Sequence, residues 1–242
     1  MKDYFSRIIS GSKLWEKIYW GIIRSIQLGS IIYFLIKGNG QFALQAAGNL
    51  VGMFSWEIML AFPKKSALRN APSYMNDVLI IGFFAASFGG VTMDFYYSIP
   101  GYDSIMHILG GGAFVWLGYE YCTLIQIKEK KQCPVGIILL CALGFSMIIS
   151  NAWELFEFTF DQYFGGDSQH WSLELAQQAE SGVEFGIFDP HDPMRFAVID
   201  TMTDMVCNVV GAAVIYIALK IYPYRHRGEK DINKQFETVK KD

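Results

Sequence analysis

Six side chains that can bind a metal ion or transfer protons occur in pairs spaced by about one helical turn. The pairs are Asp103 with His107, Glu154 with Glu157, and Asp200 with Asp204. Residues three or four apart lie on the same face of a helix, so both members of a pair can reach one site. Carboxylate oxygens and an imidazole bind Mg, Mn, Fe or Zn ions, and the sequence does not choose among these metals. A carboxylate–histidine pair also supports general acid–base catalysis without a metal.

Long apolar segments must position these pairs. Hydrophobic residues make up 52% of the 242-residue chain and charged residues only 18%, whereas roughly 25% charged is usual in soluble domains. A helix needs ~20 mostly apolar residues to cross a bilayer. Six segments qualify, and they are residues 18–36, 42–62, 78–98, 104–126, 135–158 and 196–222. The sequence therefore predicts an all-α, polytopic membrane protein in which residues 18–222 form one six-helix transmembrane domain.

The lysines and arginines predict how the six spans are oriented. Sixteen of them fall in the two terminal segments and in the loops after spans two and four, whereas Lys37 and Arg195 fall in the opposite loops. Because cytoplasmic loops are rich in Lys and Arg, both termini are expected in the cytoplasm. Residues 1–17 alternate apolar and charged side chains, as an interfacial helix does, although a frayed basic leader fits equally well. Residues 223–242 are expected to form a basic cytoplasmic tail.

With this orientation, six carboxylates from four spans fall toward the outer face. They are Asp94, Asp103, Glu154, Glu157, Asp200 and Asp204. A charged residue inside a membrane costs roughly 2.5–3.5 kcal/mol on insertion scales, and only Arg195 and His107 offer compensating charge nearby. Either some of the carboxylates are protonated or a cation lies among them. In the inner half we expect few buried ionisable groups apart from Arg24 and Glu57.

Each of these acidic side chains also has a plainer explanation. Asp103 fits the N-cap of the fourth span, and Glu154 and Glu157 fit a position at the water boundary. Asp204 and Asn208 are harder to explain in this way, because they lie two and three turns inside the sixth span. A shared buried polar site accounts for all of them together.

The outer loop, residues 159–195, is long for a simple connection. It holds seven acidic residues and Arg195 as its one lysine or arginine. Loops of this length are often lids, so we expect this one to cover the acidic site. His191 and Asp192 lie in a proline-rich run that is typical of turns.

Several common catalytic and nucleotide-binding motifs are absent. The sequence contains no G-x-x-x-x-G-K-[ST], G-x-S-x-G or H-E-x-x-H pattern, so nucleotide binding and the common hydrolase chemistries lack support. The four cysteines are scattered without a C-x-x-C pair, which argues against structural zinc and against a disulfide framework. The expected partner is the lipid bilayer, and no nucleic acid is expected.

Three sequence blocks resemble those of a known family. They are Tyr-Asp-Ser-Ile-Met-His at 102–107, Trp-Glu-Leu-Phe-Glu at 153–157 and Asp-Thr-Met-Thr-Asp-Met at 200–205. These blocks are similar to those of the YjdF-like bacterial inner-membrane family, a domain of unknown function, and the likeness covers about residues 75–220. Ile199 stands where the family pattern has Trp, and the outer loop is longer here. The resemblance supports the membrane fold and the shared site, and it implies no reaction.

A fainter similarity links the final helix, with Asn208 and Gly211, to VanZ-like membrane proteins and so to the cell envelope. Our first hypothesis is a membrane-embedded enzyme that acts on a lipid or envelope precursor at the outer leaflet of a bacterial plasma membrane. The expected ligands of a divalent cation are Asp103, Glu154, Asp200 and Asp204, and the expected catalytic residues are His107 and Glu157.

The alternative hypotheses use the same carboxylates differently. In a cation or proton transporter they form the binding site or the relay. Transporters often contain internal repeats, and the sequence shows no convincing repeat, which favours a one-sided site slightly. A non-catalytic membrane scaffold is the third hypothesis.

Overall fold

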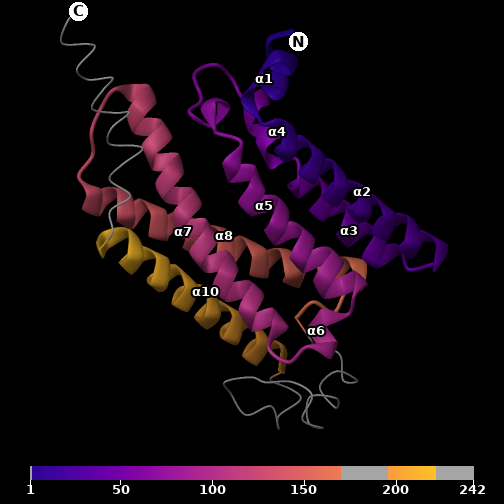
Figure 1. Ribbon diagram of the computed structural model, residues 1–242. Helices are drawn as coiled ribbons and strands as arrows, with labels where there is room; N and C mark the ends of the chain where they lie inside the picture. Colours follow the sequence, from indigo (N-terminus) through magenta and orange to yellow (C-terminus); the bar gives the residue numbers. More distant parts are fainter. Residues whose placement is uncertain (1, 170–195, 222–242) are drawn as a thin grey trace, which may run out of the picture.

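The computed structural model describes residues 2–169 and 196–221, and within these ranges every regular element is a helix. Five helices are long and apolar enough to cross a membrane, with α5 and η2 counted as one. In chain order the elements are α1 (Lys2–Gly11), α2 (Leu14–Ile36), α3 (Gly40–Gly52), α4 (Ser55–Ala61), η1 (Leu68–Asn70), α5 (Tyr74–Phe84), η2 (Ala85–Thr92), α6 (Phe95–Ser98), α7 (Tyr102–Glu129), α8 (Val135–Phe164) and α10 (Phe196–Ile221), as Figure 1 shows. The predicted all-α membrane fold is confirmed.

The predicted second span, residues 42–62, consists of two helices. α3 ends at Gly52, where a Cβ would lie 2.6 Å from the Phe83 ring, and α4 follows after a short turn. At this break the carbonyl of Met53 accepts a hydrogen bond from Arg24 (2.6 Å), which satisfies a backbone group that lipid cannot satisfy. Neither piece alone has the length of a span, so five candidates are found among the described residues where six were predicted.

The predicted third span, residues 78–98, begins and ends earlier than expected. α5 starts at Tyr74 and continues into η2, a π-helix that ends well short of residue 98. At the junction, the Tyr102 hydroxyl donates a hydrogen bond to the carbonyl of Ala85 (2.8 Å). The chain then reverses at Asp94, whose φ of 60° is left-handed. The irregular helix is therefore supported by a tyrosine of α7. The local sequence of residues 78–98 does not reveal this contact.

Helices α2 to α5 form one unit in which successive segments alternate in direction. The α3–α4 pair is antiparallel to α2, because Gln27 bonds the carbonyl of Ala46 and Arg24 bonds that of Met53. α5 and η2 run in the same direction as α2, because Trp20 bonds Asp77 and Gln27, further along α2, bonds Ser87 of η2. The core of this unit is rich in large side chains, including Trp20, Met53, Trp56, Met75 and Ile80.

Helices α7, α8 and α10 form a second unit, in which α7 and α10 are parallel and α8 is antiparallel to both. Glycines let the backbones of α7 and α10 touch. A Cβ on Gly111 would lie 2.1 Å from the carbonyl oxygen of Asn208, and one on Gly211 would lie 1.8 Å from that of Ile108. Small residues at a helix contact allow such close approach, and this contact fixes the register of α10 against α7.

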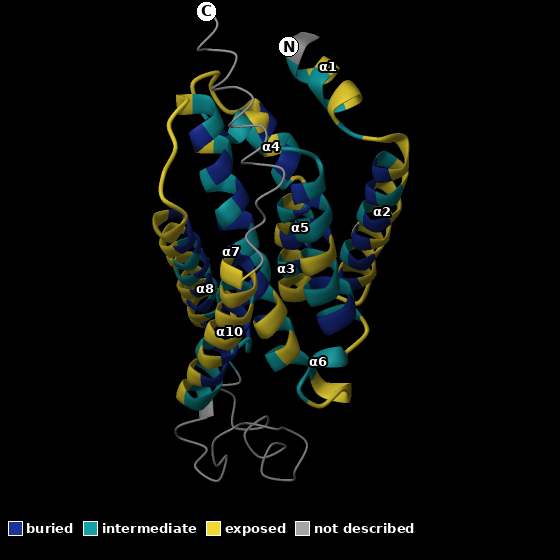
Figure 2. Cartoon of the chain, turned by 60° about the vertical axis from the view of Figure 1, so that its left-hand side comes forward, coloured by how far each residue is buried: buried dark blue, intermediate teal, exposed yellow. Residues whose placement is uncertain are grey.

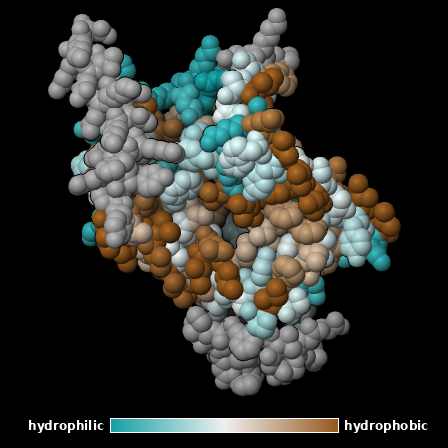
Figure 3. All heavy atoms as spheres, viewed as in Figure 1, coloured by the Kyte–Doolittle hydropathy of each residue, from teal (hydrophilic) through white to brown (hydrophobic). Residues whose placement is uncertain are grey.

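The outward faces of the helices are largely apolar. Figure 2 shows exposed residues along α2, α8 and α10, and Figure 3 shows hydrophobic residues spread across one face of the molecule. Large exposed apolar side chains occur on each of these helices, among them Ile22, Leu140, Ile148 and Val214. In a protein this rich in long apolar helices, such faces contact lipid chains.

The two ends of the bundle differ. α1 lies at one end, and α6 lies at the other, beside the first turn of α7 (Figure 1). We call these the α1 end and the α6 end. The Tyr4 hydroxyl donates to the carbonyl of Glu57 (3.2 Å) and Arg7 to that of Arg69 (2.8 Å), while Phe5 is exposed. The helix predicted within residues 1–17 is thus present, and its place on a membrane surface stays a prediction.

Candidate functional site

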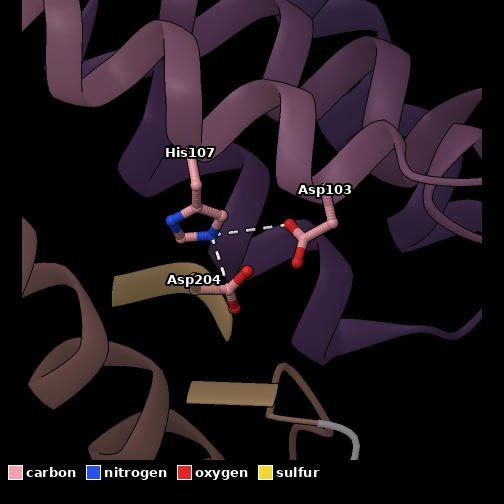
Figure 4. Close-up of side chains that lie close together, drawn as sticks. All are labelled: Asp103, His107 and Asp204. Carbon is pink, nitrogen blue, oxygen red and sulfur yellow. Dashed lines mark ion pairs between the residues drawn. The ribbon is translucent and has the colours of Figure 1, made fainter. Parts of the chain in front are cut away.

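A histidine and two carboxylates meet between α7 and α10 at the α6 end (Figure 4). Asp103 and His107 come from the first two turns of α7, and Asp204 comes from α10. His107 Nε2 lies 3.5 Å from Asp103 Oδ1 and 3.6 Å from Asp204 Oδ2. His107 and Asp204 are buried, and Asp103 is half-buried. Two of the three pairs singled out in the sequence therefore contribute to one site.

Helix α8 adds two further carboxylates. Glu154 Oε1 lies 3.9 Å from His107 Nδ1, and Glu157 Oε1 accepts a hydrogen bond from the Trp153 indole (2.7 Å). The Glu154 side chain is only 8% exposed, and neither of its oxygens has a hydrogen-bond partner among the described residues. Burying a carboxylate without a partner is costly. Glu154 therefore requires a cation or a proton at this position.

These five side chains, which we call the acidic cluster, form two overlapping sets with metal-ligand spacing. One set is Asp103, His107 and Asp204, and the other is Glu154, Glu157 and Asp204. Within each set the ligand atoms lie within 4.8 Å of one another. Oxygen ligands with one imidazole suit Mg, Mn, Fe or Zn ions. The arrangement can hold a divalent cation, and it can also share protons among its carboxylates.

Asn208 contacts the other side of the His107 ring. Its Nδ2 lies 3.0 Å from His107 Nδ1, and both side chains are buried. When the amide donates to Nδ1, a neutral imidazole carries its proton on Nε2, which faces Asp103 and Asp204. Turning the amide by half a rotation places the proton on Nδ1 and leaves Nε2 able to bind a metal. The orientation of the Asn208 amide therefore decides whether Nε2 of His107 carries a proton or can bind a metal. The position of Asn208 in the sequence, four residues after Asp204, did not suggest this function.

The remaining predicted carboxylates lie at or beyond the rim of the cluster. Asp200 is half-buried, one turn from Asp204 toward the α6 end, and belongs to neither ligand set. Asp94 is exposed at the left-handed bend before α6, where its carbonyl accepts a hydrogen bond from the Ser98 hydroxyl (2.7 Å). Asp94 therefore shapes the turn and does not join the cluster.

Tyr96 of α6 is a neighbour of the cluster that the sequence gave no reason to select. Its ring packs against Gly90, where a Cβ would lie 2.0 Å away, and edge-on against Tyr102. Burial, reinforced by the negative charges of Asp103 and Glu157, holds the pKa of the Tyr96 phenol well above its usual range. The hydroxyl therefore stays protonated at neutral pH and remains a hydrogen-bond donor.

Apolar packing separates the cluster from the α1 end of α7, α8 and α10. The backbone contact of Gly111 with Asn208 lies one turn beyond His107, and the Ser146 hydroxyl donates to the carbonyl of Gly111 (2.8 Å). A group of buried apolar side chains follows, namely Val115, Leu139, Ala142, Ala212 and Leu219. Along the described part of these three helices, packed apolar side chains therefore lie between the cluster and the α1 end.

Buried and half-buried carboxylates also occur outside the cluster, in α2, α4 and α7. Arg24 and Glu57 form the expected pair, with Nη1 2.7 Å from Oε1. Glu16 of α2 and Glu120 of α7 are also buried, in addition to the two ionisable groups that the sequence singled out. Each has a partner distant in sequence, which local patterns do not show: the Ser73 hydroxyl donates to Glu16 (3.1 Å), and the Tyr74 hydroxyl donates to Glu120 (2.6 Å).

Several predictions fall on residues that the structure does not describe. In the outer loop they concern the lid, the turn at His191 and Asp192, and Arg195, and beyond the last helix they concern the basic tail at residues 223–242. The described start of the loop region is ordered by Asp161, whose carboxylate accepts hydrogen bonds from the backbone amides of Ser168 (2.8 Å) and Gln169 (2.9 Å).

The model of one protein family, described as Predicted membrane protein (DUF2238), matches residues 18–225. This is the same family as the YjdF-like family that the three sequence blocks resemble, so that resemblance is confirmed. The similarity to VanZ-like proteins is not shown. No curated protein and no solved structure matches the chain.

Proposed function

The chain belongs to the DUF2238 family of predicted membrane proteins, and from this premise we propose that it is a membrane-embedded, metal-dependent enzyme. A divalent cation binds among the carboxylates of the acidic cluster, and the substrate is a lipid or a cell-envelope precursor at the outer leaflet. The observation that supports the cation most strongly is Glu154, whose two buried oxygens have no hydrogen-bond partner among the described residues.

The charge of the cluster supports a cation. Glu154, Glu157 and Asp204 offer oxygens that all lie within 4.8 Å of one another. Like charges at this distance repel strongly in a medium of low dielectric constant. A divalent cation removes the repulsion and satisfies Glu154 at the same time, whereas protons must be distributed over several carboxylates. A bound cation activates water at neutral pH or holds a phosphate oxygen.

The one-sided position of the cluster favours an enzyme over a transporter. A transported ion needs a path to the opposite face. Along α7, α8 and α10 that path is filled by the backbone contact at Gly111 and by the apolar group around Val115 and Ala142. A substrate that approaches from the α6 end needs no such path. Of the predicted roles, the geometry favours Asp103, Glu154 and Asp204 as ligands, and the catalytic roles of His107 and Glu157 stay predictions.

We also propose six crossings with both termini in the cytoplasm, which places the α6 end outside. The α3–α4 pair supports the sixth crossing, because it runs antiparallel to α2 as a broken span does. The concentration of Lys and Arg at the termini supports the orientation. Labelling a single cysteine at Ser168, in a variant without native cysteines, tests this topology. Access from outside is expected, and access only from the cytoplasm would contradict the outer location of the cluster.

The metal content of the detergent-purified protein tests the function. We expect divalent metal in the wild-type protein and none in the Asp200→Asn, Asp204→Asn variant. The control is Glu120→Gln, which changes a buried carboxylate of the same helix α7 outside the cluster and should keep the metal. If wild type and variants all lack divalent metal after incubation with Mn²⁺ or Zn²⁺, shared protons are the better explanation and the metal-dependent function is wrong.

A further inference from the structure

We infer that the acidic cluster holds two divalent cations, bridged by Asp204, and this inference rests on the proposed metal-dependent function. Asp204 is the one residue common to the set of Asp103 and His107 and to the set of Glu154 and Glu157. A carboxylate has two oxygens, so Asp204 can give one oxygen to each cation. α10 carries this residue between α7 and α8, and each of those helices supplies the rest of one set.

The separations between the ligands also agree with a cation in each set. Ligands about 2.1 Å from a tetrahedral metal ion lie about 3.4 Å from one another. His107 Nε2 is 3.5 Å from Asp103 Oδ1 and 3.6 Å from Asp204 Oδ2, which is long for a hydrogen bond and close to that ligand spacing. In the second set, the oxygens of Glu154 are buried and have no hydrogen-bond partner among the described residues. This is evidence for a bound cation that does not depend on the number of acidic residues nearby.

A pair of cations narrows the proposed substrate, a lipid or an envelope precursor, to one that carries a phosphate group. Paired ions about 3.5–4 Å apart bind the oxygens of a phosphate group in many enzymes. The substrate that fits is therefore a phosphate-bearing lipid or envelope precursor, which approaches from the α6 end. In this arrangement His107 and Glu157 are metal ligands, and the Asn208 amide, turned so that its oxygen accepts the Nδ1 proton, leaves His107 Nε2 free to bind the cation.

The test is the number of Mn²⁺ ions bound per chain, with the magnetic coupling between them read by electron paramagnetic resonance. We expect two coupled ions in the detergent-purified wild-type protein. Asp103→Asn and Glu157→Gln each remove a ligand from one set only, so each should retain one ion with the spectrum of isolated Mn²⁺. Asp204→Asn should lose both ions, and Glu120→Gln should keep both.

The outcomes distinguish the bridged pair of cations from the metal-dependent function on which it rests. One ion in the wild-type protein overturns the bridged pair and leaves the metal-dependent function standing, whereas no ion overturns both. Two ions without coupling, or a variant of Asp103 that loses both ions while Glu157→Gln loses none, contradict the bridge. If Asp204→Asn fails to fold, as judged by size-exclusion chromatography, the pair of Asp103→Asn and Glu157→Gln still decides the question.

Discussion

The two helical units treat buried charge in opposite ways. In the unit of α2 to α5, the two terminal nitrogens of Arg24 contact the two oxygens of Glu57, at 2.7 and 2.9 Å, and Nη2 also donates to the carbonyl of Met53. In the unit of α7, α8 and α10, Glu154 is equally buried, yet its nearest basic atom is His107 Nδ1 at 3.9 Å. The first pattern is what a membrane protein needs to join a broken helix to its neighbour. In the second pattern Glu154 lacks a close counter-charge, and a bound ligand can supply it.

The comparison teaches that buried charge alone does not identify a functional site. Glu16, Glu57 and Glu120 are carboxylates like those of the cluster, but each has a hydrogen-bonding partner distant in sequence. These contacts hold the first unit together and connect it to α7. The cluster differs because three of its carboxylates lie close to one another and the oxygens of Glu154 have no hydrogen-bond partner among the described residues.

The largest effect is expected where the first unit is broken. Arg24→Met removes one partner of a mostly buried pair and leaves Glu57 without its counter-charge. The free energy of unfolding should fall by about 3–5 kcal/mol, measured by thermal unfolding in detergent. The double variant Arg24→Met, Glu57→Leu should recover most of this loss. An equal loss in both variants would mean that the pair is not the cause.

A somewhat smaller loss is expected from Gly211→Ala. The added Cβ would overlap the carbonyl oxygen of Ile108 at 1.8 Å, so α10 must move away from α7 and the free energy of unfolding should fall by about 3 kcal/mol. Mn²⁺ binding should weaken as well. Gly110→Ala is the matched control, because the nearest atom to its Cβ is Asn208 Oδ1 at 3.9 Å. If Gly110→Ala weakens Mn²⁺ binding as much, the close backbone contact does not position the cluster.

The third prediction concerns Glu154→Gln and whether this change in the cluster raises or lowers stability. Wild-type protein should gain about 2.7 kcal/mol of stability when Mn²⁺ is at a hundred times its dissociation constant. Glu154→Gln should gain little from Mn²⁺, and in the presence of a chelator it should be at least as stable as wild type, because a repelling charge is gone. Thermal unfolding with Mn²⁺ and with chelator measures both. If Glu154→Gln is less stable than wild type in the presence of chelator, as Arg24→Met is expected to be, the two units do not differ in how they treat buried charge.

The smallest effect is expected at Asp77. Its Oδ1 accepts a hydrogen bond from the Trp20 indole (2.7 Å), and an asparagine at this position can still accept through its carbonyl oxygen. Asp77→Asn should therefore change the free energy of unfolding by no more than about 1 kcal/mol. Mn²⁺ content should be unchanged. A loss of bound Mn²⁺ would show that the first unit takes part in cation binding.

Parts of this arrangement follow from local sequence and other parts do not. The pairing of Asp103 with His107 follows from helical spacing, and their meeting with Asp204 follows once the positive-inside pattern orients the spans. The break after Gly52 does not follow, because the Phe83 ring and Arg24 that accommodate it come from other helices. The partners of buried carboxylates are equally hidden. Nothing near Glu120 in the sequence points to Tyr74, and only folding distinguishes this satisfied carboxylate from Glu154.

The most direct test of the central claim is an experimental structure of the protein soaked in Mn²⁺, with anomalous scattering recorded at the manganese edge. We predict anomalous density between α7, α8 and α10, within coordination distance of Glu154 and Asp204. Density there in the wild-type protein and not in Asp204→Asn would establish the cation site. A map without anomalous density, in which the carboxylate oxygens lie in pairs at hydrogen-bonding distance, would show that protons hold the cluster together and would contradict the account.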